Sequence, residues 1–160
     1  MTRTEYPITI PYEFDPNRKG AKYKLGEAFK NAGEFLESVA KHHRGLDYLV
    51  NPTTAWNEGS DIESEHASVK SGRASLACLY GDSFEEILNT YFAGVKSNKW
   101  LYMVQVDDTA IEYEMNATEF REFMEVWGRM GTESGSHKGK VRILATSVKM
   151  IKWLEDRVAC

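Results

Sequence analysis

The stretch WLYMVQV, residues Trp100–Val106, is apolar at every position except Gln105. Side chains alternate between the two faces of a strand, so apolar residues on both faces predict a central strand that is covered on both sides. The pair Asp107-Asp108 predicts a turn directly after this strand. The next residues, 110–115, alternate in the manner of a half-buried strand. Its expected inward residues are Ile111, Tyr113 and Met115, and its expected outward residues are Glu112 and Glu114.

Helices are predicted on both sides of these two strands. Apolar residues recur at every third or fourth position from Lys22 to His43, which predicts an amphipathic helix ended by Gly45. Two further helices begin at capping boxes, in which two side chains satisfy unpaired backbone amides: Ser83 with Glu86, and Asn116 with Glu119. The remaining predicted elements are a helix over Ser147–Val158, strands over Leu46–Val50 and Lys140–Ala145, and a loop over Gly131–Gly139.

The order of these elements is helix, three short strands, helix, two strands, helix, strand and helix. This order predicts a mixed α/β (α+β) fold in which helices flank one central mixed sheet. A chain of 160 residues fits a single domain, residues 1–160. Residues 1–20 contain three prolines and are expected to form an extended N-terminal arm.

The composition excludes several classes of protein. Hydrophobic residues make up 42% of the chain and the net charge is −4, which excludes a disordered tail and argues against a dedicated nucleic-acid coat protein. An enzyme that visits nucleic acid can still be mildly acidic. Cys78 and Cys160 show neither disulfide nor zinc spacing, and no apolar run approaches the ~18 residues of a membrane span. We therefore expect a cytoplasmic protein without a membrane partner.

The polar segment from Asp61 to Gly72 is predicted to form a tight hairpin that turns at Glu65-His66. In that register Asp61 faces Lys70 and Glu63 faces Ser68, so the four side chains share one face of the strand pair. Two carboxylates on a rigid face suit Mg²⁺, which proteins bind through one or two carboxylates and several waters. A lysine beside them can orient or deprotonate an attacking water. The segment thus predicts a metal site with Asp61 and Glu63 as ligands.

At these residues the sequence resembles the PD-(D/E)xK nuclease superfamily, which has the restriction-endonuclease-like fold. The core of that family is a helix, three strands, a helix and a strand, and residues 22–106 are predicted in that order. The family's first acid opens the second strand, as Asp61 does here. Its second acid and its lysine lie on the third strand, where Ser68-Val69-Lys70 stands. It often adds a glutamate on the first helix, and Glu37 is the best match.

The resemblance implies a Mg²⁺-dependent nuclease that acts on DNA, with RNA as an alternative substrate. The implied catalytic residues are Asp61, Glu63, Lys70, Glu37 and Ser68. Ser68 departs from the pattern because it takes the place of the second acid, and Glu63 would have to supply that carboxylate from the neighbouring strand. Without it, the site would have lost catalysis.

Two other interpretations stay open. The charged face can simply be solvated, in which case an Asp61–Lys70 salt bridge contributes under ~1 kcal/mol. Alternatively, the chain is a non-catalytic binding module with a protein partner: a degenerate nuclease fold, or a mobile-element protein that inhibits a host defence or nucleic-acid enzyme. The sequence contains no pattern that indicates the oligomeric state.

Basic residues near the hairpin are candidates for contacts with a nucleic-acid backbone, provided that the fold brings them to one side. They are Arg73, Lys138, Lys140 and Arg142. A phosphate-binding P-loop is excluded in the segment that contains two of these lysines, because Ser134 and Val141 replace residues that it requires. The four histidines show no spacing typical of zinc ligands.

Overall fold

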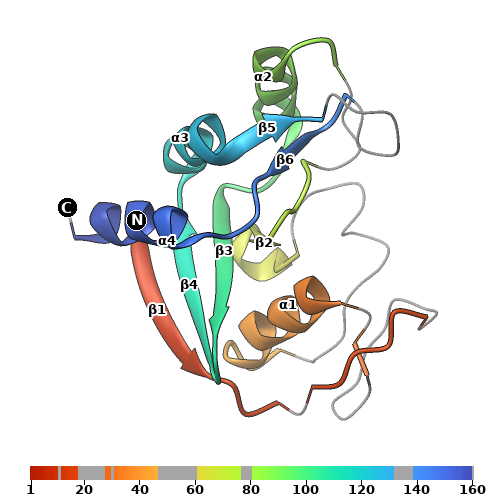
Figure 1. The fold of residues 1–160 in the computed structure, drawn as a ribbon, viewed down its shortest axis with the longest axis vertical. Coiled ribbons are helices and arrows are strands. Elements are labelled where there is room, and N and C mark those ends of the chain that lie inside the picture. The colour runs from red at the N-terminus through yellow and green to blue at the C-terminus, as the bar shows by residue number, and fades with distance from the viewer. Residues whose placement is uncertain are drawn as a thin grey trace.

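A computed structural model gives the fold of the chain (Figure 1). It describes residues 1–10, 12–17, 28–29, 31–46, 61–76, 81–131 and 139–159. The predicted strand over residues 46–50, apart from Leu46, lies outside the described residues, and so do Lys138 and both cysteines. The fold is mixed α+β, as predicted, with a four-stranded mixed sheet, a two-stranded sheet and four α-helices within the described residues.

The main sheet has the strand order β1-β4-β3-β2. Its strands are β1 (Thr2–Pro7), β2 (Ala67–Ser71), β3 (Lys99–Val106) and β4 (Thr109–Met115). Strand β3 pairs with β4 in antiparallel fashion across a tight turn in which Asp107 has a φ of 53°. Strands β2 and β3 are parallel, and a parallel pair needs a crossover connection, which helix α2 (Phe84–Gly94) provides.

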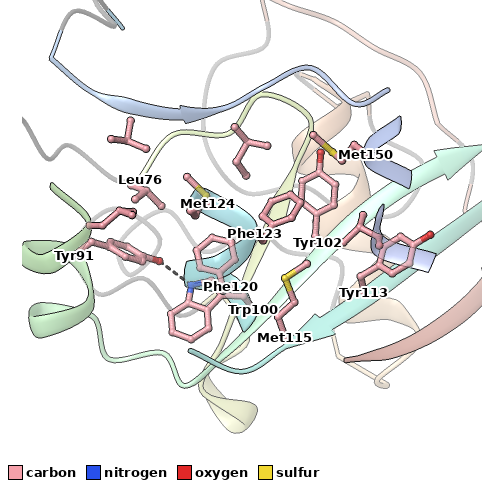
Figure 2. Packing of buried hydrophobic residues seen from close by; sticks show 14 of the residues in the cluster. Leu76, Tyr91, Trp100, Tyr102, Tyr113, Met115, Phe120, Phe123, Met124 and Met150 are labelled. Atoms are coloured by element: carbon pink, nitrogen blue, oxygen red, sulfur yellow. Dashed lines mark hydrogen bonds between the residues drawn. The ribbon is translucent and has the colours of Figure 1, made fainter. Parts of the chain in front are cut away.

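Strand β3 is the central strand that its sequence predicts. Trp100 and Tyr102 point to one face of the sheet, while Leu101 and Met103 point to the other, and all four are at most 1% exposed. One core joins the first face to α2, α3 (Ala117–Trp127) and α4 (Val148–Val158), and Figure 2 shows its aromatic centre, where Trp100 donates a hydrogen bond to Tyr91. The second core joins the other face to helix α1 (Ala32–His42). Helices therefore cover both faces of the sheet.

The predicted helix starts are confirmed at three positions. Ser83, Asn116 and Ser147 each accept a hydrogen bond from the amide three residues later, and Asn116 forms the complete capping box with Glu119. Helix α1, in contrast, begins at Ala32 rather than at Lys22, because Asn31 is its cap and Phe29 pairs with Phe14 in a β-bridge. Within the described residues, no helix combines the length and the apolar character that a bilayer crossing requires.

Three further predictions need correction. Part of the expected N-terminal arm is strand β1, which pairs with β4 along its whole length. Strand β5 (Gly128–Met130) was not predicted, and it pairs with β6 (Val141–Ile143), which is shorter than its predicted range. Glu112 does not face solvent: it is 3% exposed, and both of its carboxylate oxygens accept hydrogen bonds from Arg44, at 2.7 and 3.0 Å.

Candidate functional site

The hairpin forms with a different register from the predicted one. Ile62 pairs with Ala67, so Asp61 comes opposite Ser68 instead of Lys70. The turn is longer than expected: Glu63–Glu65 is a short 3₁₀ helix, and His66 completes the turn with a left-handed φ of 50°. The backbone of Glu63 therefore lies in the turn and not opposite Ser68, and the side chain of Glu63 is outside the described part of the structure.

Asp61 is fixed against the outer edge of β2. Its Oδ2 accepts a hydrogen bond from the backbone amide of Val69 at 2.7 Å, and the hydroxyl of Ser68 approaches the same oxygen at 3.5 Å. Ser68 stands where the nuclease pattern has its second acid. It is 1% exposed, so its hydroxyl is buried directly beside Asp61. A carboxylate that accepts a hydrogen bond from a backbone amide loses rotational freedom, so the Asp61 side chain is held in one orientation.

Glu37 of helix α1 is the second carboxylate at this place. The pKa of Glu37 is raised to about 7, mainly by burial and next by the neighbouring charge of Asp61, with a smaller contribution from a hydrogen bond shared with that carboxyl group, while Lys41 acts in the opposite direction. The Lys41 ammonium lies 3.2 Å from Oε1 of Glu37, one helical turn away. This oxygen is buried and makes no hydrogen bond of good geometry. This oxygen of Glu37 is thus held in an ion pair by Lys41 and makes no hydrogen bond within the described residues.

Lys70 follows Ser68 by two residues on β2, and the two side chains therefore share a face. Burial lowers the pKa of Lys70, while the charges of Asp61 and Glu37 act in the opposite direction. We call Glu37, Asp61 and Lys70 the open cluster. It joins α1, the start of the hairpin and β2 in one electrostatically coupled group.

Two members of the open cluster, Glu37 and Lys70, line a cleft of about 790 Å³. The cleft lies at the carboxyl ends of the parallel strands β2 and β3, where ligands of open α/β sheets commonly bind. The first turn of α1, from Asn31 to Glu34, forms one rim. Asp61 does not line the cleft itself and lies behind Glu37 as its carboxylate neighbour.

The predicted basic residues divide into three groups. Arg73, in the turn after β2, and Arg142, on β6, line the same cleft as Glu37 and Lys70. Lys140 lies beside β6 but is not part of the cleft lining. Lys138 falls outside the described residues. The fold therefore brings two of the four basic residues to the open cluster, although they lie far from α1 in the sequence.

The two carboxylates of the open cluster are of the ligand type that a divalent, oxygen-binding cation takes. No group of three or more His, Cys, Asp or Glu side chains is arranged as a metal site within the described ranges. Mg²⁺ does not need one, because it is held through one or two carboxylates together with waters and substrate phosphates. A bound cation would offset the repulsion between Glu37 and Asp61 that raises the pKa of Glu37.

Sequence analysis missed some residues of the site. Lys41 is paired with Glu37 at the i,i+4 spacing of a helix, and that spacing was readable from the sequence once the helix was assigned. Asn31, Gln105 and Thr146 contribute polar groups to the cleft. No local pattern marks these three, since they come from three separate elements that only the folded chain brings together.

Comparisons of the chain with models of protein families, with curated proteins and with solved structures found no match.

Proposed function

We propose that the protein is a Mg²⁺-dependent phosphodiesterase of the nuclease type that acts on DNA. The observation that carries this proposal is the contact of Glu37 with Asp61 next to Lys70, at a cleft that also holds Arg73 and Arg142. Two carboxylates, an amine and two guanidinium groups are the groups needed to bind a cation, activate water and hold phosphates.

The resemblance to the PD-(D/E)xK superfamily supports the same function. Its acid at the start of the second strand, its lysine on the third strand and its glutamate on the first helix correspond to Asp61, Lys70 and Glu37. The charges of these three side chains act on one another, which supports the proposal, although the hairpin register differs from the predicted one. In the proposed site Glu37, and not Glu63, provides the second carboxylate.

The chemistry of each residue follows from its surroundings. Asp61 and Glu37 would hold the cation, which supplies charge stabilisation at phosphorus and lowers the pKa of bound water. Desolvation lowers the pKa of Lys70, which is half-buried, and this favours the neutral amine that would take a proton from the attacking water. Arg73 and Arg142 would bind phosphate oxygens along the cleft.

One observation favours a second candidate function, a non-catalytic nucleic-acid or protein-binding module. Ser68 replaces the second acid with a hydroxyl that approaches Asp61, and Asp61 already accepts the amide of Val69. If these bonds leave too little ligand capacity for a cation, the cleft binds its partner without cleaving it. Measuring metal affinity therefore separates the two functions.

The test measures cleavage of supercoiled plasmid and of a single-stranded oligonucleotide in Mg²⁺ and in Mn²⁺. We expect cleavage by the wild type and a loss of about 100-fold or more in Lys70→Met, because a buried catalytic group contributes on that order. Methionine keeps the aliphatic packing of Lys70, so folding is retained. The matched control is Lys152→Met on α4, where the ammonium is exposed and pairs with Asp156.

Metal binding is measured separately, by calorimetry and by the shift in melting temperature on adding Mg²⁺. A protein that binds the ion gains stability with its concentration, and Glu37→Gln is expected to remove that gain. Equal cleavage by wild type and Lys70→Met would contradict the proposal. Absence of both cleavage and metal affinity, with a partner bound, would establish the binding module instead.

A further inference from the structure

The wall of the cleft contains two arginines that have no anionic partner within the described part of the chain. No carboxylate there lies within ion-pair distance of Arg73 or of Arg142. The Nε of Arg142 is buried and makes no hydrogen bond, and one terminal nitrogen reaches the backbone oxygen of Arg73 only at 3.5 Å. The guanidinium group of Arg142 thus makes one long hydrogen bond, and its Nε donor is not used.

A second arginine on the paired strands β5 and β6, Arg129, can be compared directly with Arg142. Arg129 stands directly opposite Arg142 in the register of the two strands, and like charges in that position repel. Arg129 donates to the backbone oxygens of Val126 and Gly128, at 3.0 and 2.6 Å, and does not line the cleft. Of this pair, only Arg142 faces the cleft with an unused donor, which is the arrangement expected of an anion-binding group.

The other side chains that line the cleft indicate which kind of ligand carries the anionic group. Apolar side chains of Leu36, Val69 and Met103 line it together with the charged groups. The bases of a duplex are stacked inside the helix, and only an unpaired strand can place a base against such a wall while its phosphate meets an arginine. A cleft of about 790 Å³ also has the size that receives a small ligand, such as one nucleotide, and not the width of a duplex.

We propose, on the basis of the nuclease function above, that Arg142 and Arg73 form a phosphate subsite for single-stranded DNA. The phosphate beside the scissile one would lie against these two guanidinium groups, while its nucleoside contacts the apolar wall. The substrate would then be an unpaired strand, a flap or a frayed end. An intact duplex would have to open before its backbone reaches Glu37 and Lys70.

The test measures binding, without cleavage, in a buffer that contains EDTA. Fluorescence anisotropy compares a labelled single-stranded oligonucleotide of roughly 12 nucleotides with its blunt duplex. We expect the wild type to bind the single strand about 10-fold or more tightly than the duplex. Arg142→Gln should weaken binding of the single strand about 10-fold and reduce the slope of log affinity against log salt by about one, since one phosphate contact is lost.

Arg129→Gln is the matched control, because it removes the same charge from the same hairpin but outside the cleft. It should change affinity less than about twofold. Arg73 is exposed, so Arg73→Gln provides a second test of the subsite should Arg142→Gln fail to fold. Equal effects of the Arg142 and Arg129 variants would overturn the subsite, and equal or tighter binding of the duplex would overturn the single-strand preference. The expected binding pattern without any cleavage would support the subsite while refuting the nuclease function.

Discussion

Two clusters of charged side chains connect α1 and the residues that follow it to the sheet, and they differ in how completely their polar atoms are hydrogen-bonded. The first is the open cluster of Glu37, Asp61 and Lys70. The second, which we call the closed cluster, contains Arg44, Glu112, Glu65 and Lys99. In the closed cluster Arg44 donates to both oxygens of Glu112, to Glu65 and to the backbone oxygen of Ala40. In the open cluster one buried oxygen of Glu37 has no hydrogen bond.

This difference is the one expected between a structural role and the functional role that we propose for the open cluster. A buried polar network in which every group is satisfied fixes the geometry of a core, and the closed cluster holds the end of α1 to β4 and to the turn at Glu65. A buried carboxylate with a raised pKa and a like charge beside it lowers stability when it is ionised, and a bound cation would offset that loss. Altering the closed cluster should therefore lower stability with little effect on ligand binding. Altering the open cluster should weaken ligand binding with little loss of stability.

The largest effect is expected from Arg44→Met in the closed cluster. Removing one member of a buried ion pair leaves the other charge uncompensated, and Glu112 is 3% exposed, so the free energy of unfolding should fall by about 3–5 kcal/mol. Urea denaturation followed by circular dichroism measures the change. The double variant Arg44→Met/Glu112→Leu is the control, and it should recover most of the loss. A loss below about 1 kcal/mol in the single variant would show that the cluster does not support the fold.

The next effect is the pH dependence of stability that Glu37 produces. Its pKa is raised from an ordinary 4.5 to about 7, so the folded state binds more protons than the unfolded state between these values. The stability contributed by this group is fully present below pH 4.5 and is lost as the pH rises through 7. At about 1.4 kcal/mol for each unit of pKa, the loss is on the order of 3 kcal/mol at most.

Glu37→Gln should remove this pH dependence, since glutamine does not titrate. The measurement is the urea midpoint of both proteins at a series of pH values between 4 and 8. Wild type and variant should diverge as the pH rises, with the variant the more stable at pH 8. Parallel curves would mean that Asp61 and burial do not act on Glu37 as the structure indicates.

The smallest effect is expected at the rim of the closed cluster. Lys99 pairs with Glu65 and Glu114 at 3.3 and 3.4 Å, and all three side chains are about one-third exposed. Water and salt screen such pairs, so Lys99→Met should lower the free energy of unfolding by less than about 1 kcal/mol. The same denaturation assay at low and at high salt measures it, and the difference from wild type should shrink as salt is added. A loss as large as that of Arg44→Met would mean that the rim and the centre of the cluster act as one unit.

Sequence analysis predicted well those elements whose formation depends on residues that are close together in the sequence. The apolar run of β3 and the caps at Ser83, Asn116 and Ser147 are local signals, and each is confirmed. Strand β1 was missed because its residues are largely polar, and its backbone pairing with β4 is what holds it. The sequence predicts an exposed Glu112 because no neighbouring residue indicates its ion-pair partner, Arg44, which lies 68 residues away.

For the candidate site, residue types in the sequence indicate members but not their geometry, and the roles of these members stay a prediction. Glu37, Asp61 and Lys70 were identified by their residue types and by the elements that bear them. The hairpin register was wrong because the turn is set by distant partners: Arg44 and Lys99 both bind Glu65, and the amide of Asn98 donates to the backbone oxygen of His66. Contacts of this kind cannot be read from the residues of the hairpin itself.

The hydrogen bond from the Val69 amide to Asp61 has a consequence for solubility. In the described part of the sheet β2 is the last strand on its side, and an edge strand with unpaired amides is a template for aggregation through strand pairing. The Asp61 carboxylate occupies one of these amides and adds a negative charge that repels an approaching chain. Replacing Asp61 would therefore do more than remove an anchoring group: it would leave an amide at the edge of β2 available to the backbone of another molecule.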